Sequence, residues 1–260
     1  METRVTDWVV ERLRAAGCVF AEEEAGLLRT RAAEGADLEE LVRLRAAGRP
    51  LEHVVGWAEF CGLRMAVGEG AFVPRRRTEF LVSEAVAVAR PGAVVLDLCC
   101  GVGALGAAVA AAVPGAELHA ADIDPVALEY ARVNVAPYGG RVHEGDLYGA
   151  LPAGLRGRVS LLVANAPYVP TGSLGLLPAE AREYEPRTAL DGGPDGLDVQ
   201  RRLAAGAPDW LAPGGHLLIE TSGRQSPSTA SAMTAAGLAV RAVSSEEWGA
   251  TVVVGTRAVD

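Results

Sequence analysis

The chain has 260 residues, half of them hydrophobic, and its formal net charge is −9. The length suits one large α/β domain with a smaller attachment, and charge, Gly or Pro interrupts each apolar stretch before the roughly 20 residues that a membrane span requires. The acidic balance disfavours a sequence-independent grip on a nucleic-acid backbone, which depends on clustered Lys and Arg. These features exclude a membrane-spanning protein and favour a protein or small-molecule substrate.

Residues 1–50 are predicted to form a small helical domain. One apolar face comprises Val5, Trp8, Val9 and Leu13, and a second stripe comprises Leu38, Leu41, Val42 and Leu44. Asp7 and Glu11 make the first helix amphipathic, unlike the uncharged core of a secretory signal, so we expect a cytoplasmic protein. Asp37 followed by Glu40 resembles a capping box, and Gly48 before Arg49-Pro50 is a helix stop.

Residues 51–73 shorten to strand-like pieces, HVVGWAEF and GLRMAV, separated by Cys61-Gly62. This pattern predicts a hairpin that links the helical domain to a second domain over residues 74–260.

From about Pro91 onward, predicted strands and helices alternate. The strands are AVVLDL, ELHAAD, RVHEG, VSLLVAN, HLLIET, AVRAV and ATVVVGT, and helices are expected from about Ala104, from Pro125 and from Leu197 to Trp210. Alternation of this kind indicates a mostly parallel sheet covered on both faces. The last two strands follow one another without a helical stretch, which predicts that one of them is antiparallel to the rest.

A glycine loop follows the first of these strands. Gly101, Gly103 and Gly106 form the pattern GxGxxG, and Asp122 ends the next strand. Gly101 and Gly103 would let the backbone approach a ligand, whereas an acid at the position of Asp122 can bind ribose hydroxyls. The loop alone fits a nicotinamide enzyme and a methyltransferase equally well.

The tetrapeptide Asn165-Ala166-Pro167-Tyr168 favours the methyltransferase. It ends a buried strand, and the carboxyl ends of strands face the ligand crevice in a doubly wound sheet. Asn165 Oδ1 and the Ala166 carbonyl oxygen would accept both protons of an –NH2 group, while Tyr168 supplies a flat face. An amide nitrogen shares its lone pair with its carbonyl, so methyl transfer requires orientation and acceptors for the developing charge. Asp146 follows the third strand and could accept from an adenine amino group.

The four cysteines and four histidines suggest neither a disulfide framework nor a metal site. Cys18, Cys61, Cys99 and Cys100 show no CxxC spacing, and the histidines are scattered. We expect buried free thiols and no metal.

This ordered series resembles the HemK/PrmC-type protein-glutamine N5-methyltransferases, a branch of the Rossmann-like class I methyltransferases. Further matching segments are Pro50–Gly56, Phe72–Arg75, Glu183–Arg187, Ala189–Gly193 and Asp195–Asp198. The resemblance implies a seven-stranded catalytic domain, a helical domain that docks the substrate, and S-adenosylmethionine as methyl donor. It also implies a protein substrate with an exposed glutamine, for which the Gly-Gly-Gln motif of a peptide-chain release factor is the leading candidate, and we favour a monomer.

The resemblance assigns a role to each site residue. The cofactor residues are Asp97, Cys99, Cys100, Gly101 and Gly103 around the methionine part, Asp122 and Ile123 at the ribose, and Asp146 and Leu147 at the adenine. Asn165 to Tyr168 would hold the glutamine amide, with Asn165 also touching the cofactor. Phe72 would wall the substrate pocket.

Three departures from the family pattern point to a paralogue, whose protein substrate need not be a release factor. Ala166 replaces the first proline of Asn-Pro-Pro-Tyr, and Cys99 replaces the first loop glycine. Arg75-Arg76-Arg77 stands where the family often reads Arg-Pro-Glu, and such a run is commonly solvated surface. Two alternatives remain. The same acceptor geometry suits an exocyclic amine in RNA or DNA, and Ala166 and Cys99 fit a cofactor-binding interaction module that has lost catalysis.

Overall fold

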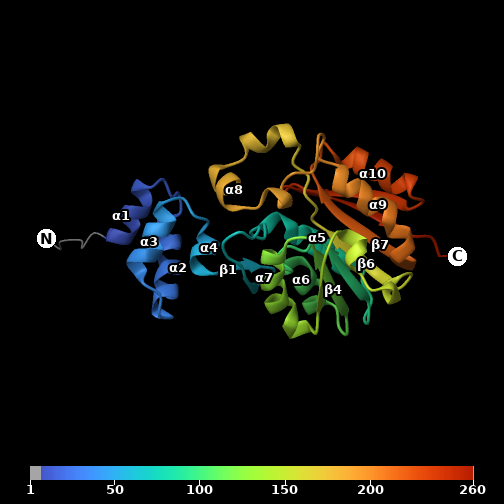
Figure 1. Ribbon diagram of the computed structural model, residues 1–260, viewed down its shortest axis with the longest axis horizontal. Coiled ribbons are helices and arrows are strands. Elements are labelled where there is room, and N and C mark those ends of the chain that lie inside the picture. The colour runs from blue at the N-terminus through green and yellow to red at the C-terminus, as the bar shows by residue number, and fades with distance from the viewer. Residues whose placement is uncertain (1–6, 260) are drawn as a thin grey trace.

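The computed structural model describes residues 7–259. Four helices come first: α1 (Trp8–Ala15), α2 (Ala21–Ala33), α3 (Leu38–Ala46) and α4 (Leu51–Val55). They pack around Val9, Leu13, Leu28 and Val42 and lie at one end of the molecule (Figure 1). Within these residues, no helix combines the length and apolar character of a membrane span.

Two details predicted for the helical domain are wrong, one in a helix face and one in a helix cap. Trp8 is 49% exposed, because the α1 face that packs inward carries Val9 and Leu13 instead. The Asp37 side chain accepts from the backbone amides of Glu39 and Glu40, but Glu40 pairs with Arg43, so only half of a capping box forms. Val5 lies outside the described residues.

The predicted hairpin is confirmed, although its first strand is shorter than expected. β1 (Trp57–Phe60) pairs antiparallel with β2 (Leu63–Ala66). Cys61 and Gly62 turn the chain with positive φ angles of 51° and 71°. The expected strand over His53–Val55 is instead the end of α4, where Pro50 starts the first turn and Gly56, with φ 88°, stops it.

The predicted sheet is confirmed. Its seven strands are β3 (Val94–Leu98), β4 (Glu117–Asp122), β5 (Arg141–Glu144), β6 (Val159–Ala164), β7 (Leu211–Thr221), β8 (Ala239–Ser245) and β9 (Ala250–Thr256). Their order is β5-β4-β3-β6-β7-β9-β8. β3 to β7 run parallel, and β9 is antiparallel to both of its neighbours. The sheet is thus mostly parallel with one antiparallel strand, as the sequence indicates.

Helices cover both faces of the sheet (Figure 1). One face is covered by α5 (Glu79–Val88), α6 (Ala104–Ala112) and α7 (Pro125–Val135), and the other by α9 (Asp198–Trp210) and α10 (Ser226–Ala235). α8 (Ala179–Tyr184) lies outside the sheet. Short 3₁₀ turns are η1 (Arg76–Thr78), η2 (Ala136–Tyr138), η3 (Leu147–Ala150), η4 (Ala153–Leu155), η5 (Thr171–Leu176) and η6 (Arg187–Ala189). Val95 packs toward the face covered by α5, α6 and α7, and Leu96 packs toward the face covered by α9 and α10, as alternation along a strand requires.

The segment that carries α8 connects the sheet domain to the N-terminal helices. Arg45 of α3 donates to Glu180 at 2.6 Å and also binds the buried Glu24, and the Tyr184 hydroxyl donates to the Ala47 carbonyl at 3.3 Å. In Figure 1 this segment extends from the sheet domain toward the N-terminal helices. The two parts of the chain are therefore joined by α8 as well as by the hairpin.

Candidate active site

A cavity of about 910 Å³ opens at the carboxyl ends of β3, β4 and β6. Nearly all of the residues that the sequence predicted for the site line it together: Phe72, Asp97, Cys99, Cys100, Gly101, Asp122, Ile123, Asp146, Leu147, Asn165, Ala166, Pro167 and Tyr168. Gly103 is not among the lining residues. The rule that strand ends share one edge of a parallel sheet brings these distant segments to one place.

The glycine loop is held against the end of β4. The Gly101 amide donates to Asp122 Oδ2 at 2.8 Å, and the Cys100 amide donates to the Ala121 carbonyl at 3.1 Å. Asp122 Oδ1 accepts from the Asp124 amide at 3.0 Å. Burial raises the pKa of Asp122, against the lowering effect of these amides. The loop and the acid therefore form one fixed unit, although Cys99 takes a left-handed φ of 58° that a glycine would adopt more easily.

Two of the three glycines serve packing. A Cβ on Gly103 would lie 3.0 Å from Val135 and 3.3 Å from Ala131, so this glycine lets α7 approach the loop. A Cβ on Gly106 would lie 3.0 Å from Asp97. Of the two glycines expected to let a ligand approach, only Gly101 faces the cavity, and close helix packing explains the other.

Asp97 is fully buried beneath the loop. Its Oδ2 accepts from the Gly106 amide at 2.8 Å, whereas its Oδ1 has no hydrogen-bond partner within residues 7–259. Burial raises the pKa of Asp97 to about 8. An unpartnered buried carboxyl oxygen at the wall of a cavity is a group that a ligand can satisfy.

The far end of the cavity carries Asp146, Leu147 and Ile123. Asp146 is held by Arg202 of α9 at 2.6 Å, and Leu147 has a left-handed φ of 48°. Ile123 is 59% exposed. Sequence reasoning did not find Arg202, because nothing near it in the sequence indicates that α9 packs against the segment after β5.

The Asn-Ala-Pro-Tyr turn carries two hydrogen-bond acceptors, Asn165 Oδ1 and the Ala166 carbonyl oxygen. Asn165 Nδ2 donates to Thr78 Oγ1 at 3.2 Å, which fixes the side-chain amide. Among residues 7–259, no protein group donates a hydrogen bond to Asn165 Oδ1 or to the Ala166 carbonyl oxygen. Thr78 is buried at the end of η1, so the side-chain amide of Asn165 is held from a separate segment of the chain.

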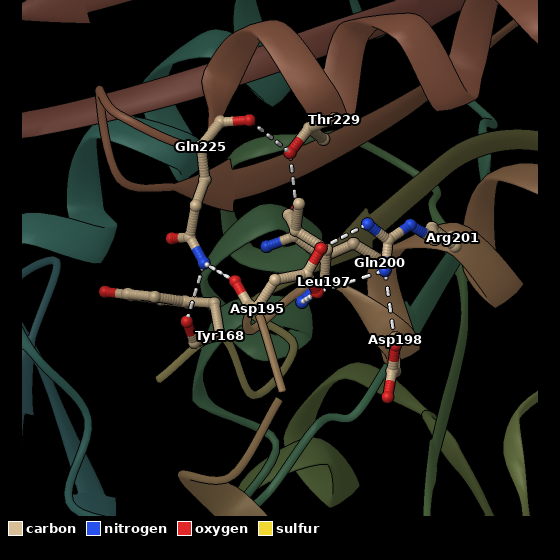
Figure 2. A network of polar contacts seen from close by, with 8 residues as sticks. All are labelled: Tyr168, Asp195, Leu197, Asp198, Gln200, Arg201, Gln225 and Thr229. Carbon is tan, nitrogen blue, oxygen red and sulfur yellow. Dashed lines mark hydrogen bonds and ion pairs between the residues drawn. The ribbon is translucent and has the colours of Figure 1, made fainter. Parts of the chain in front are cut away.

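A second loop, which also lines the cavity at Asp191, Gly192 and Gly193, supports this turn. The Gly192 amide donates to the Val169 carbonyl at 2.9 Å, and Gln225 Nε2 donates to the carbonyls of Tyr168 at 2.9 Å and Asp195 at 3.0 Å. Figure 2 shows Gln225 joining these two backbone segments. A Cβ on Gly192 would lie 2.7 Å from the Pro167 carbonyl oxygen, so only glycine permits the close approach of the loop.

The Arg75-Arg76-Arg77 run is not simply solvated surface. Arg75 pairs with the buried Glu185 at 2.5 Å and stacks over Phe72 at 4.6 Å. Glu185 also accepts from the Val73 amide at 3.1 Å. Arg77 pairs with the buried Glu220 at 3.2 Å. Two of the three arginines thus belong to the cavity wall. The prediction of solvated surface was wrong for them, because their acidic partners are more than a hundred residues away in the sequence.

The free-thiol expectation holds in part. All four cysteines are free, but only Cys100 is fully buried, while Cys18, Cys61 and Cys99 are half-buried.

Comparison with known proteins identifies the relatives of this chain. Residues 76–174 match the family model described as "Methyltransferase small domain". A release factor glutamine methyltransferase of Geobacter sulfurreducens is 43% identical, over 69% of this chain and 63% of that protein. One of Mycolicibacterium smegmatis is also 43% identical, over 76% of this chain and 71% of that protein. The chain thus spans just under two thirds of the first relative and somewhat more of the second.

Solved structures confirm the predicted fold, that of the Rossmann-like class I methyltransferases. A methyltransferase of Pyrococcus furiosus aligns with a TM-score of 0.57 at 17% identity, covering 76% of this chain and 90% of that one. A ribosomal protein L11 methylase of Lactobacillus delbrueckii aligns with a TM-score of 0.53 at 16% identity, covering 72% and 81%.

Proposed function

Because this chain belongs to the release factor glutamine methyltransferase family, we propose that it transfers a methyl group to the side-chain amide nitrogen (N5) of a glutamine in a protein. The methyl donor is S-adenosylmethionine, which leaves as S-adenosylhomocysteine. One observation carries the proposal: the unused acceptors of Asn165 and Ala166 belong to the same cavity wall as Asp122 and the glycine loop.

The residues of the cavity fit this cofactor. A Cβ on Gly101 would meet no atom within 4 Å, so open space lies beside the loop backbone. We assign the methionine part to Asp97 and the loop Cys99–Gly101, the ribose to Asp122 with Ile123, and the adenine to Asp146 with Leu147. Gly103 is left out because it packs against α7. When bound, the cofactor supplies an electrophilic methyl group on a positively charged sulfur.

The chain's own contribution is to orient and stabilise the amide. Asn165 Oδ1 and the Ala166 carbonyl oxygen would each accept one N–H of the glutamine –NH2 group. As the nitrogen bonds to the methyl carbon it gains positive charge, and its two N–H groups become stronger donors. Fixed acceptors are then worth more than in the ground state, which is how they lower the barrier. As the methyl carbon leaves the sulfur, one proton passes from the nitrogen to bulk water, which restores the neutral amide.

Protein glutamine is the substrate class that these observations favour. The relatives are named for release factors, and we propose that the substrate here is a release factor or a protein with a similarly exposed glutamine. Such a substrate would place the reaction in the cytoplasm, where translation ends. We further propose a division into residues 1–50, 51–73 and 74–260, in which the N-terminal helices dock the protein substrate. Replacement of proline by Ala166 keeps the carbonyl acceptor, with a loss of order 1 kcal/mol in preorganisation.

The test is methyl transfer from radiolabelled S-adenosylmethionine to a purified release factor, compared with the same factor carrying Ala in place of its Gly-Gly-Gln glutamine. Label is expected in the first protein only, together with the added mass of one methyl group on the glutamine peptide. Asn165→Ala should lower the rate about 10²–10³-fold, the usual effect of removing one transition-state hydrogen-bond partner. Its affinity for S-adenosylhomocysteine, measured by calorimetry, should stay within a few-fold.

Other outcomes would redirect the proposal. Label that appears in RNA and disappears with ribonuclease would assign the site to an exocyclic amine. Binding of S-adenosylhomocysteine without label in any protein or RNA would favour an interaction module that has lost catalysis. Binding of NADH in its place would contradict the methyltransferase assignment itself.

A further inference from the structure

Arg77, Tyr168 and Glu220 form a closed triangle of polar contacts beside the proposed amide site. Arg77 Nη2 donates to the Tyr168 hydroxyl at 2.7 Å, and Arg77 Nε donates to Glu220 Oε1 at 3.2 Å. The Tyr168 hydroxyl donates in turn to Glu220 Oε1 at 3.4 Å. The three residues come from η1, the Asn-Ala-Pro-Tyr turn and β7, so the triangle joins three separate segments.

Glu220 anchors this triangle. Its residue is 1% exposed, and Glu220 Oε2 has no hydrogen-bond partner within the described part of the chain. Arg77, by contrast, keeps 47% of its side chain exposed and lines the cavity. A buried carboxylate needs a cation close by, so Glu220 fixes the position of the guanidinium. Glutamate at position 77, as in the family pattern, would set two like charges against each other.

Tyr168 is held at both its backbone and its side chain. Gln225 binds the Tyr168 carbonyl, and the Tyr168 side chain extends away from that contact (Figure 2). Burial, and next the charge of Glu220, raise the pKa of Tyr168 to about 12, so the hydroxyl keeps its proton and can donate and accept at once. The ring is therefore fixed at both ends, directly after the acceptors of Asn165 and Ala166.

We propose that Arg77 is a positioning residue for methyl transfer: with Glu220 it holds the Tyr168 ring as a fixed wall against which the glutamine side chain is oriented. This inference rests on the proposed function. Arg77 acts through Tyr168, and the substrate amide itself is held by Asn165 and Ala166. The expected signature is a change in the use of the protein substrate with no change in cofactor affinity.

The test compares Arg77→Gln with Arg76→Gln. Both variants lose one positive charge from the same run, but Arg76 is exposed, does not line the cavity and forms no ion pair within residues 7–259. Arg77→Gln should raise KM for the release factor about tenfold and lower kcat several-fold, with the Kd for S-adenosylhomocysteine within about twofold of the unmodified protein. Arg76→Gln should leave all three unchanged, and Arg77→Lys should recover part of the loss.

A double-mutant cycle separates positioning from stability. Because Arg77 acts through the Tyr168 hydroxyl, its replacement should have little effect once that hydroxyl is absent. In a Tyr168→Phe background, Arg77→Gln should lower kcat/KM by less than about twofold. Arg77→Gln leaves Glu220 without its cation, so the melting temperature is followed as well, and Arg77→Gln combined with Glu220→Gln should recover Tm but not KM.

Two results would count against the inference, and they differ from failure of the proposed function. Kinetics of Arg77→Gln that match Arg76→Gln, or fully additive losses in the cycle, would overturn the inference alone. Absence of methyl transfer by the unmodified protein would contradict the proposed function, and this inference would fall with it.

Discussion

Replacement of Gly192, a glycine of the cavity wall, by alanine should displace the proposed catalytic turn through close backbone contacts. A Cβ at Gly192 would lie 2.7 Å from the Pro167 carbonyl oxygen and 2.6 Å from that of Gly196. The first distance is 0.7 Å shorter than 3.4 Å, where ordinary contact begins. The loop cannot easily move aside, because the Gly192 amide binds the Val169 carbonyl and the Gly192 carbonyl binds the Asp198 amide, each at 2.9 Å.

The strain must therefore displace the Asn-Ala-Pro-Tyr turn. Misplacement of a reacting group by about 1 Å costs on the order of 10²-fold in rate, so a 0.7 Å shift predicts a loss in kcat/KM of roughly 30-fold, about 2 kcal/mol. Overpacking should also lower the free energy of unfolding by about 1–3 kcal/mol. The glycine loop at Gly101 lies on other strands, so the Kd for S-adenosylhomocysteine should change by less than about threefold.

Steady-state methylation of a release factor and calorimetry measure these quantities, with Gly154→Ala as the matched control. A Cβ on Gly154 meets no atom within 4 Å, so that variant should behave as the unmodified protein. If Gly192→Ala kept kcat/KM within threefold of Gly154→Ala, the claim that this loop fixes the catalytic turn would be refuted.

Three further changes test other parts of the structure. Burial raises the pKa of Asp97 from 3.8 to about 8, so between these pH values the folded chain keeps a proton that the unfolded chain has lost, and the free energy of unfolding falls as pH rises. Asp97→Asn should flatten this pH dependence in urea unfolding, and an unchanged dependence would contradict the assignment. Asp122→Ala should raise the Kd for S-adenosylhomocysteine by tenfold or more by calorimetry, since hydrogen bonds to a charged group contribute about 1.5–3 kcal/mol. Arg45→Ala should lower the free energy of unfolding by about 3 kcal/mol, because it leaves the buried Glu24 unpaired, whereas Arg43→Ala, which breaks an exposed pair, should cost less than about 1 kcal/mol in the same denaturation assay.

The sheet could be predicted because its strands are short, buried and bounded by Gly, Pro or charge. β4 and β9 begin and end at the predicted residues. α5 and α10 escaped prediction for different reasons. α5, EFLVSEAVAV, is apolar around most of its circumference, and α10, SPSTASAMTA, consists mainly of small residues that give no stripe of period 3.6.

The candidate site was predictable where a motif stands at a strand end, as Asp122 and Asn165 do. Topology alone brings such residues together. The contacts that hold the site in shape were not predictable, since Arg77 meets Glu220 across 143 residues of sequence and Gln225 meets Tyr168 across 57. Such pairs depend on the completed fold, and no local pattern marks them.

The place of β9 in the sheet has a consequence for the order of folding. This strand is the last in the sequence, yet it lies between β7 and β8, so β8 has no sheet neighbour until residues 250–256 have arrived. During synthesis the ribosome must therefore release nearly all of the described chain before the sheet can close. Glu220 pairs in register with Val252 of β9, and the carboxylate that anchors Arg77 becomes enclosed only at this final step. The newly made chain would thus bring together Asp97 and Asp122 before it encloses the triangle of Arg77, Tyr168 and Glu220.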